Sequence, residues 1–327
     1  MTKSKILITG ASGFIAGYLI EKLLAKGHKI VGLDNYSKYG PIKKAHDDNP
    51  NYKLVKGDAK DVKLLKKLLK DCDHFVAAAA MIGGISYFHK YAYDLIAENE
   101  RITASAFDAA IYAFKKCKLK KITVISSSMV YESTDIFPTP ETALFKSPAP
   151  QSTYGFQKLA CEYFAKGAWE QYKLPYTIIR PFNCVGVGEG NKKMAMSHVV
   201  PDLIYKILKK QSPLHILGRG DQIRCYTYGG DIAEGIYLSL FSPKAFNNDF
   251  NISTSQTTTV LDLAKLIWKK INPNKPFCYV SDRSFEYDVQ KRIPDVTKAK
   301  KLLRFETKVT LDEMLDEVIL WIKKNCK

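Results

Sequence analysis

Tyr154 and Lys158 have the residue types and the spacing needed to move a proton. They lie four positions apart near the start of a segment with helical periodicity, residues 152–173, so they share one face of a helix, one turn apart. An ammonium group close to a phenol favours the phenolate form, which can exchange a proton with a hydroxyl group of a substrate. Because the Tyr-x-x-x-Lys pattern also arises by chance, its significance depends on the residues around it.

Three consecutive serines strengthen this interpretation. Residues 126–128 end an apolar, β-branched segment, 121–127, that predicts a strand. Ligands of parallel sheets bind beyond the carboxyl ends of the strands. A serine hydroxyl there can hydrogen-bond the same substrate oxygen as the tyrosine. The three serines are the candidates for this role, Ser127 and Ser128 among them.

A glycine-rich segment near the N-terminus predicts a dinucleotide site. Gly10 and Gly13 follow a predicted strand at 5–9 and open a predicted helix at 13–26. Glycine allows the backbone to turn tightly and to approach a pyrophosphate. The N–H groups and the dipole at the helix N-terminus then stabilise the charge of the pyrophosphate.

Two carboxylates end the next two predicted strands. Asp34 stands where an acidic side chain hydrogen-bonds the adenine ribose, and it would repel a 2′-phosphate, which favours NAD over NADP. The alternative for Asp34 is a turn at the strand end. Asp58 either reaches the adenine edge or has a local structural role.

The elements that position these residues alternate regularly along the first half of the chain. Strands are predicted at 5–9, 29–34, 52–58, 74–79, 121–127 and 176–183, and helices at 13–26, 60–71, 92–117 and 152–173. Parallel strands joined by helices of this length form right-handed crossovers. The pattern therefore predicts a doubly wound parallel α/β sheet of the Rossmann type, covered on both faces.

The alternation ends after Asn183. A glycine-rich loop at 186–190 is followed by predicted helices near 197–211, 231–241, 260–271 and 310–325. We expect a dinucleotide-binding domain at 1–183, to which the chain returns at 226–255. The remainder, 184–327, is expected to form a smaller mixed α/β lobe, with a cleft between the two.

The composition narrows the class of protein. With 327 residues, of which 46% are hydrophobic, the chain can form a globular core. It has neither a run of about 20 apolar residues nor an N-terminal signal segment, so we expect a cytoplasmic protein without a membrane partner.

The cysteines and the charged residues bear on metal ions and on partners. Seven scattered cysteines without a Cys-x-x-Cys pair indicate reduced thiols and no metal site. The net charge is +17, but only seven basic residues are arginines, which argues against nucleic acid and favours a small anionic substrate.

Together these motifs resemble the extended short-chain dehydrogenase/reductases, and among them the NAD-dependent nucleotide-sugar epimerase/dehydratase family. The resemblance covers nearly the whole chain and includes the loop at 9–17 and the Arg-Pro-Phe-Asn segment at 180–183. It implies that Tyr154 is the acid/base, that Lys158 holds the nicotinamide ribose and that Ser127 assists. It also implies a homodimer formed through the helix at 92–117 and the tyrosine helix.

The resemblance further implies which residues bind the cofactor and the substrate. NAD would contact Gly10, Ser12, Gly13, Phe14, Ile15, Asp34, Asn35, Asp58, Ala59, Ala78, Ala79, Asn99, Tyr154, Lys158 and Pro181. A nucleotide-diphosphate sugar would contact Gly83, Gly84, Ser127, Asn183, His198, Val199, Arg224 and Arg292. In the second set the planar guanidinium groups suit a diphosphate.

The residues that follow Ser127 bear on the reaction. Sugar 4,6-dehydratases of this family carry an acidic pair there and decarboxylases a glutamate, whereas this chain has Ser128 and Met129. The difference favours C4 epimerisation of a nucleotide-diphosphate hexose. That reaction needs only removal of a hydride by NAD, rotation of a transient 4-keto sugar and return of the hydride.

Other functions stay open at this point. Segments 81–85 and 197–201 resemble the substrate loops of GDP-fucose synthases, and the first also resembles that of GDP-mannose 3,5-epimerases. His198 would then be a second acid/base, although Met129 replaces the cysteine such enzymes use. Capping a helix or packing beside the phosphate is the other role for His198. The alternatives are a 3,5-epimerase or a 4-keto-sugar epimerase/reductase acting on a GDP-sugar, a nucleotide-sugar dehydrogenase, and a non-catalytic nucleotide- or RNA-binding protein.

Three aromatic residues follow Gly84, namely Tyr87, Phe88 and His89. This group either shapes the sugar pocket or packs against the smaller lobe.

Overall fold

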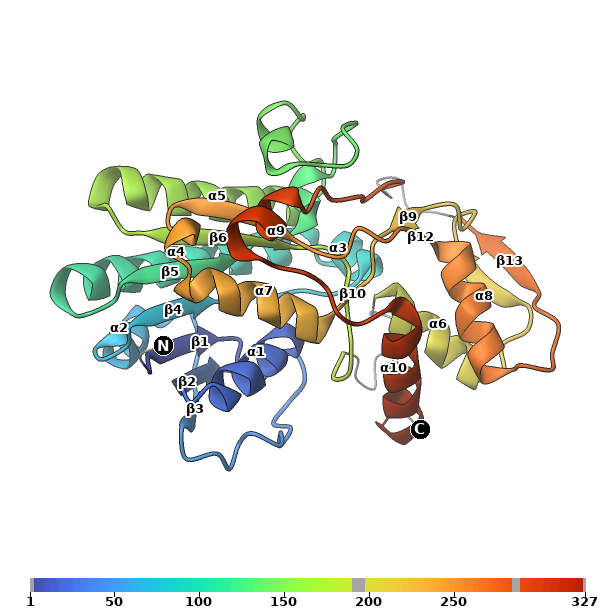
Figure 1. Ribbon diagram of the computed structural model, residues 1–327, viewed down its shortest axis with the longest axis horizontal. Helices are drawn as coiled ribbons and strands as arrows, with labels where there is room; N and C mark the ends of the chain where they lie inside the picture. Colours follow the sequence, from blue (N-terminus) through green and yellow to red (C-terminus); the bar gives the residue numbers. More distant parts are fainter. Residues whose placement is uncertain (1–2, 190–197, 284–288, 326–327) are drawn as a thin grey trace.

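A parallel sheet forms the centre of the molecule (Figure 1). The computed structural model describes residues 3–189, 198–283 and 289–325. Seven strands lie in the order β11-β6-β5-β4-β1-β2-β3, and each neighbouring pair is parallel. Their bounds are β1 Lys5–Thr9, β2 Lys29–Asp34, β3 Tyr52–Lys56, β4 His74–Ala77, β5 Lys121–Ile125, β6 Tyr176–Pro181 and β11 Asn248–Ile252. The strand order reverses between β1 and β4, and sheets of this kind bind ligands outside the carboxyl ends of the strands at that point.

Helices cover both faces of the sheet, because side chains along a strand point alternately to one face and the other. Ile6 and Ile8 of β1 pack with α1 and α7, whereas Leu7 lies in the opposite layer with α2, α4 and α5. The bounds of these helices are α1 Phe14–Ala25, α2 Val62–Leu69, α4 Ala92–Lys116, α5 Thr153–Tyr172 and α7 Gly229–Phe241. Two buried apolar layers therefore enclose the sheet, which confirms the predicted doubly wound fold.

The second half of the chain contributes to two regions of the molecule. Helix α7 and strand β11 complete the sheet region, whereas α6, α8 and α10 surround a separate core that includes Leu203, Ile267 and Val318 (Figure 1, right). The remaining elements are α3 Ile85–Lys90, β7 Cys184–Val185, α6 Val199–Leu208, β8 Leu214–Leu217, β9 Ile223–Arg224, β10 Thr227–Tyr228, β12 Thr258–Thr259, α8 Val260–Ile271, β13 Tyr279–Asp282, α9 Thr297–Leu303 and α10 Leu311–Asn325, with short 3-10 helices at η1 Ser128–Tyr131, η2 Glu141–Phe145 and η4 Pro243–Ala245. The division into domains at residue 183 stays a prediction.

The predicted elements agree with the observed ones to within a few residues, and the sequence did not predict α3 or α9. The third to sixth strands end at Lys56, Ala77, Ile125 and Pro181, each two residues earlier than predicted. The two residues that follow each of these ends lie outside the sheet. The carboxyl ends of the strands are therefore followed by loops. Position 190 of the glycine-rich loop and Ser197 of the segment 197–201 lie outside the described residues.

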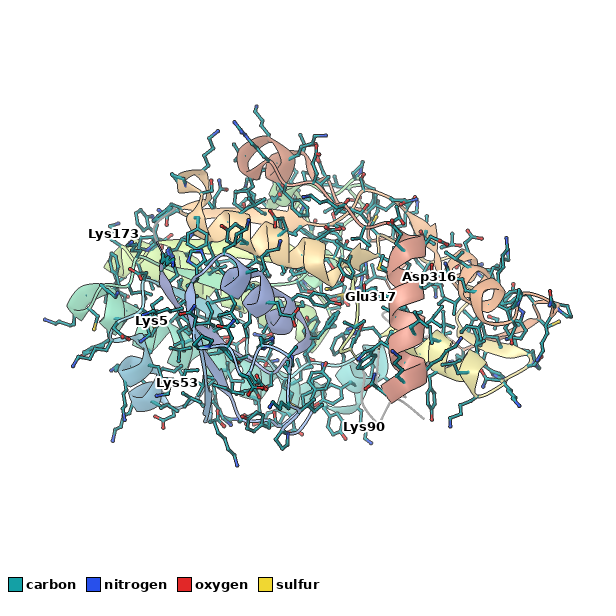
Figure 2. The ribbon with its side chains drawn as sticks, turned by 60° about the horizontal axis from the view of Figure 1, so that its bottom comes forward. Lys5, Lys53, Lys90, Lys173, Asp316 and Glu317 are labelled. Carbon is teal, nitrogen blue, oxygen red and sulfur yellow. The ribbon has the colours of Figure 1, made fainter. Side chains whose placement is uncertain are left out.

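The surface carries its positive charge in separate places. Figure 2 shows Lys53, Lys90 and Lys173 on the outside of the ribbon, at β3, at α3 and at the end of α5.

The six cysteines in the described part of the chain are free, and no group of side chains suited to a metal ion occurs there. None of the helices so described is long and apolar enough to span a bilayer.

Lys121 makes the stability of the fold depend on pH. It is fully buried at the start of β5, and its Nζ donates a hydrogen bond to the Ser239 carbonyl of α7 at 2.6 Å. Burial lowers the pKa of Lys121 to about 7, whereas the unfolded chain keeps this proton to a pH of about 10.4. Between these values the unfolded state binds more protons, so this group makes the free energy of unfolding rise with pH, by up to about 1.4 kcal/mol per pH unit.

We expect Lys121→Met to remove this rise. Urea denaturation at pH values between about 7 and 9 would measure the free energy of unfolding of both proteins. The wild type should gain stability relative to the variant as the pH increases. Lys53→Met, at an exposed position of β3, serves as the control. Parallel curves for the wild type and Lys121→Met would contradict the prediction.

Candidate functional site

A large cleft lies over the carboxyl ends of the strands. Its volume is about 1360 Å³, and its lining extends from Gly10 in the first loop to Arg292 near the C-terminal part of the chain. The cleft brings together nearly all residues predicted for the site. These are Gly10, Ser12, Gly13, Phe14, Ile15, Asp34, Asn35, Asp58, Ala59, Ala78, Ala79, Gly83, Gly84, Ser127, Ser128, Tyr154, Lys158, Pro181, Asn183, His198, Val199, Arg224 and Arg292.

Asn99 is the exception among the predicted residues, because it does not line this cleft. It is 1% exposed on α4. Its Oδ1 accepts a hydrogen bond from the Met81 backbone N–H at 2.7 Å, and its Nδ2 donates to the Met81 carbonyl at 2.9 Å. Both polar groups of the side chain are used in this way, so Asn99 fixes the loop that follows β4, and its contact with the cofactor stays a prediction.

The glycine loop leaves room for a pyrophosphate at the N-terminus of α1. Gly10 has a φ of +69°, and a Cβ atom there would lie 2.9 Å from Cα of Ala79, so only glycine fits. A Cβ atom on Gly13 would lie 2.8 Å from the carbonyl oxygen of Gly10. Gly13 is the N-cap of α1 and supplies no side-chain cap. The first N–H groups of the helix are therefore available to an anion, as the pyrophosphate of a dinucleotide requires.

Asp34 ends β2 beside this loop. Its Oδ2 accepts a hydrogen bond from the Ser12 N–H at 2.9 Å, and its Oδ1 accepts one from the Tyr36 N–H at 2.7 Å. The side chain thus makes the turn contact considered as the alternative, and it also faces the cleft, where its remaining lone pairs can accept ribose hydroxyls. Asp58 likewise forms a local contact, accepting from the Lys60 N–H at 2.8 Å, while it lines the cleft.

Helix α5 places Tyr154 and Lys158 on the cleft wall. The helix begins after Ser152, whose hydroxyl accepts a hydrogen bond from the Gly155 N–H at 3.0 Å. Both side chains of the pair are buried, and Nζ of Lys158 lies 6.0 Å from the centroid of the Tyr154 ring. Nζ also donates to the Ile125 carbonyl at 2.9 Å, which anchors the ammonium group at the end of β5.

The serine candidates follow the same strand. Ser127 is the N-cap of η1, and its hydroxyl accepts a hydrogen bond from the Met129 N–H at 3.2 Å. Ser128 is buried at the first position of η1. The two residues and Tyr154 line one cleft, so they can act on one ligand.

Phe88 covers one face of the Tyr154 ring. The two rings are stacked, with centroids 4.3 Å apart and planes 11° from parallel. Phe88 lies in α3, lines the cleft and belongs to the same apolar cluster as Leu95 and Met129. Phe88 therefore shapes the pocket around the phenol, which is one of the two roles considered for it, and helps to exclude water from it.

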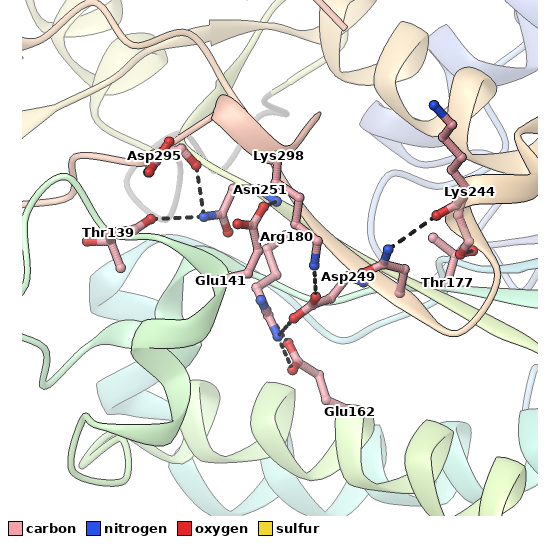
Figure 3. Close-up of polar contacts among 12 residues, drawn as sticks. Thr139, Glu141, Glu162, Thr177, Arg180, Lys244, Asp249, Asn251, Asp295 and Lys298 are labelled. Carbon is pink, nitrogen blue, oxygen red and sulfur yellow. Dashed lines mark hydrogen bonds and ion pairs between the residues drawn. The ribbon is translucent and has the colours of Figure 1, made fainter. Parts of the chain in front are cut away.

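A buried ionic network holds the serine loop against α5 (Figure 3). Arg180 of β6 is fully buried. Its Nε and Nη2 donate to the two carboxylate oxygens of Glu162 at 2.7 and 2.6 Å, and Nη2 lies 2.8 Å from Oδ2 of Asp249. Glu162 also accepts a hydrogen bond from the Ser126 hydroxyl at 2.6 Å. The network therefore connects α5, β6 and β11 with the residue before Ser127.

The same network continues toward the C-terminal part of the chain. The Tyr131 hydroxyl accepts from Nη1 of Arg180 at 2.6 Å and donates to Oδ1 of Asn251 at 3.0 Å. Nδ2 of Asn251 donates to the carbonyls of Thr139 and Asp295, at 3.0 and 3.2 Å (Figure 3). The segment that carries Arg292 is thereby anchored to the sheet.

The substrate side of the cleft carries the predicted polar residues. Arg224 is 8% exposed, and its Nη1 donates to the carbonyls of Ile223 and Gln290 at 2.9 and 3.2 Å. Asn183 has a φ of +34° and donates from Nδ2 to the Cys225 carbonyl at 3.4 Å. These contacts orient both side chains at the cleft.

His198 is paired with a residue that the sequence analysis did not identify. Its Nδ1 contacts Oε1 of Glu189, which is buried and also lines the cleft. His198 is the N-cap of α6, but its side chain makes no cap hydrogen bond. The histidine therefore does not act as a helix cap, and its catalytic role stays a prediction.

Glu132 is a second cleft residue that the sequence analysis missed. It directly follows η1, and its Oε2 accepts a hydrogen bond from the Ser152 N–H at 2.9 Å. The residues that directly follow Ser127, namely Ser128 and Met129, are not carboxylates. Three positions beyond Met129, the acidic side chain folds back to the wall that carries Tyr154.

Comparison with known families agrees with this site. Residues 6–253 match the NAD dependent epimerase/dehydratase family, and the chain therefore belongs to that family. The match confirms the resemblance found in the sequence, and it identifies an enzyme of the extended short-chain dehydrogenase/reductase type that uses NAD.

Individual relatives are similar over their full length. A putative UDP-glucose 4-epimerase of Methanocaldococcus jannaschii is 29% identical over 322 residues, which are 98% of this chain and 99% of that protein. The crystal structure of UDP-glucose 4-epimerase from Thermotoga maritima with UDP-glucose is 27% identical, with a TM-score of 0.85 over 98% of this chain and 99% of that one. The crystal structure of UDP-glucuronic acid 4-epimerase from Bacillus cereus, in complex with UDP-glucuronic acid and NAD, is 26% identical in sequence. Its TM-score is 0.85 over 98% of this chain and 99% of that one.

Proposed function

We propose that this chain is an NAD-dependent 4-epimerase of a nucleotide-diphosphate hexose. The observation that carries the proposal is the meeting of Tyr154, Lys158 and Ser127 with the glycine loop in one cleft. A phenol beside an ammonium group and a hydroxyl can remove a proton from a sugar hydroxyl. The glycine loop and Asp34 suit a dinucleotide without a 2′-phosphate.

Each residue of this set has a separate task. Tyr154 takes the proton of the sugar 4-hydroxyl and later returns it, and Ser127 holds the same oxygen by a hydrogen bond. Lys158, anchored at the Ile125 carbonyl, holds the nicotinamide ribose and keeps a positive charge near the phenol. When bound, NAD would supply the acceptor, and then the donor, of a hydride. Asn183, Arg224 and Arg292 hold the diphosphate while the sugar turns.

The two residues that follow Ser127 favour epimerisation over dehydration or decarboxylation by the usual route of the family. The positions after Ser127 are Ser128 and Met129, and neither side chain is a carboxylate that could move a proton at a neighbouring carbon. The only chemistry required of the protein is then proton exchange at one oxygen. This is the chemistry that Tyr154 and Ser127 provide.

Product analysis by NMR tests the proposal. We expect the purified protein, incubated in D₂O with UDP-glucose, UDP-N-acetylglucosamine and GDP-mannose in turn, to produce the C4 epimer of at least one sugar without deuterium at carbon. Deuterium at C3 or C5 would instead indicate 3,5-epimerisation involving His198. Accumulation of NADH without an epimer would indicate a dehydrogenase.

A homodimer is the proposed assembly. Several aromatic side chains are exposed along α4 and α5: Tyr112 at 43%, Phe156 at 48%, Tyr163 at 65% and Phe164 at 37%. Phe156 and Tyr163 are seven residues apart and share one face of α5. An exposed group of large apolar side chains on packed helices is typical of a protein–protein contact.

We expect Tyr163→Glu to weaken this dimer by 100-fold or more, because the charge would be buried without a partner. Analytical ultracentrifugation at several protein concentrations measures the effect. Tyr279→Glu, which changes an exposed tyrosine of β13, should leave the dimer intact. A wild-type monomer, or a variant that sediments like the wild type, would contradict the assembly.

We also propose a cytoplasmic location. The support is that the six cysteines of the described residues are free, Cys278 at an exposed position among them. Free thiols are typical of reducing compartments. Cell fractionation tests the location directly.

A further inference from the structure

Glu132 lies on the cleft wall next to the proposed acid/base. Its Oε2 accepts a hydrogen bond from the N–H of Ser152, the residue two positions before Tyr154. A Cβ atom on Gly155 would lie 2.9 Å from the same oxygen, so the carboxylate packs against the first turn of α5. The N-terminus of a helix stabilises a negative charge at this position.

The other oxygen of this carboxylate lacks a donor. Oε1 is buried and has no hydrogen-bond partner among the residues that the structure describes. Glu132 nevertheless lines the cleft in which the sugar would bind. A buried oxygen of this kind is costly unless water or a ligand satisfies it. Oε1 therefore has an unused capacity to accept a hydrogen bond, which a group bound in the cleft could fill.

We propose that carbon 6 of the sugar faces Glu132, which makes this enzyme selective for a neutral hexose over a hexuronate; the inference rests on the proposed function. A sugar hydroxyl can donate to Oε1, whereas the carboxylate of a uronate cannot donate and carries the same charge as Glu132. Two like charges about 6 Å apart in a partly desolvated site repel strongly enough for a selectivity on the order of 100-fold.

The nearest cation along α5 is anchored at the end of β5 instead of pairing with Glu132. This cation is Lys158, one turn beyond Tyr154, and its ammonium group is bound to the Ile125 carbonyl at 2.9 Å. In the proposed reaction this group serves the nicotinamide ribose. Removing the charge of Glu132, with its shape retained, should therefore admit the uronate.

Glu132→Gln is the variant that tests the inference. Glutamine keeps the length of the side chain and an oxygen for the Ser152 N–H, but it carries no charge. The holoenzyme would be assayed with UDP-glucose and UDP-glucuronate, by kcat/KM and by calorimetric dissociation constants. We expect the wild type to prefer UDP-glucose by about 100-fold. The preference should fall at least 10-fold in Glu132→Gln, mainly through better use of UDP-glucuronate.

Two further variants keep the test decisive. Glu132→Asp retains the charge, so it should still exclude UDP-glucuronate even if binding of UDP-glucose weakens. Glu170→Gln removes an exposed carboxylate of α5 and should leave the preference unchanged. Melting temperatures show whether each variant is folded.

The outcomes separate this inference from the proposed function. If the wild type binds or converts both sugars equally, or if Glu132→Gln keeps the wild-type preference, the role of Glu132 is overturned and epimerisation stands. If both sugars bind with the expected preference but no epimer forms, the role of Glu132 stands and the reaction is overturned. If neither sugar binds, the role of Glu132 is overturned, and epimerisation is then judged with UDP-N-acetylglucosamine and GDP-mannose.

Discussion

Tyr154→Phe is expected to lower kcat for epimerisation by about 100- to 10,000-fold, the range that general acid–base catalysis supplies. The variant loses only the phenol oxygen. Its phenylalanine ring would keep the stacking on Phe88 and the place in the apolar cluster with Leu95 and Met129. Binding of NAD and of the nucleotide sugar should therefore change little, and the loss should appear in kcat rather than in KM.

Single-turnover and steady-state assays of the purified variant would measure this effect. Tyr172→Phe removes a hydroxyl from the last turn of the same helix and serves as the matched control. Its activity should equal that of the wild type. An active Tyr154→Phe enzyme would exclude the proposed role of the phenol, whereas an inactive one that no longer binds NAD would indicate a structural defect.

Arg180→Met is expected to lower the free energy of unfolding by about 3–5 kcal/mol, the usual cost of leaving a buried ion without its partner. Arg180 and Glu162 are both fully buried, and Asp249 is also bound to the guanidinium group (Figure 3). Without Arg180, the carboxylate of Glu162 would retain only the Ser126 hydroxyl among the partners described here. Urea denaturation measures the loss.

Arg101→Met provides a control for Arg180→Met. Arg101 is paired with Glu98 on the surface of α4, with 58% of its side chain exposed. Exposed pairs of this kind contribute about 0–1 kcal/mol. A loss for Arg180→Met that is no larger than that for Arg101→Met would show that the buried network does not stabilise the fold.

The parts of the site that the sequence predicts are those set by local structure. Gly10 and Asp34 stand at the ends of strands, and the carboxyl ends of parallel strands meet at one edge of a sheet. Tyr154 and Lys158 share a helix face because of their spacing. For these residues, knowing the element and the position within it is enough to place the residue at the cleft.

The contacts that the sequence does not predict depend on distances between elements. Asn99 lies in the middle of α4, and only the packing of that helix against the loop after β4 decides that its amide binds Met81. Glu132 and Glu189 are acidic residues in loops, and no periodicity indicates where such side chains point. Their contacts with Ser152 and His198 exist only in the folded chain.

The stacked ring of Phe88 limits how the phenol of Tyr154 can be reached. With one face of that ring covered and the residue 5% exposed, a reagent that attacks the aromatic carbons has to enter through the cleft. A nucleotide sugar bound there should therefore slow nitration at Tyr154. Chemical labelling of this one ring would in this way report how much of the protein carries a bound sugar.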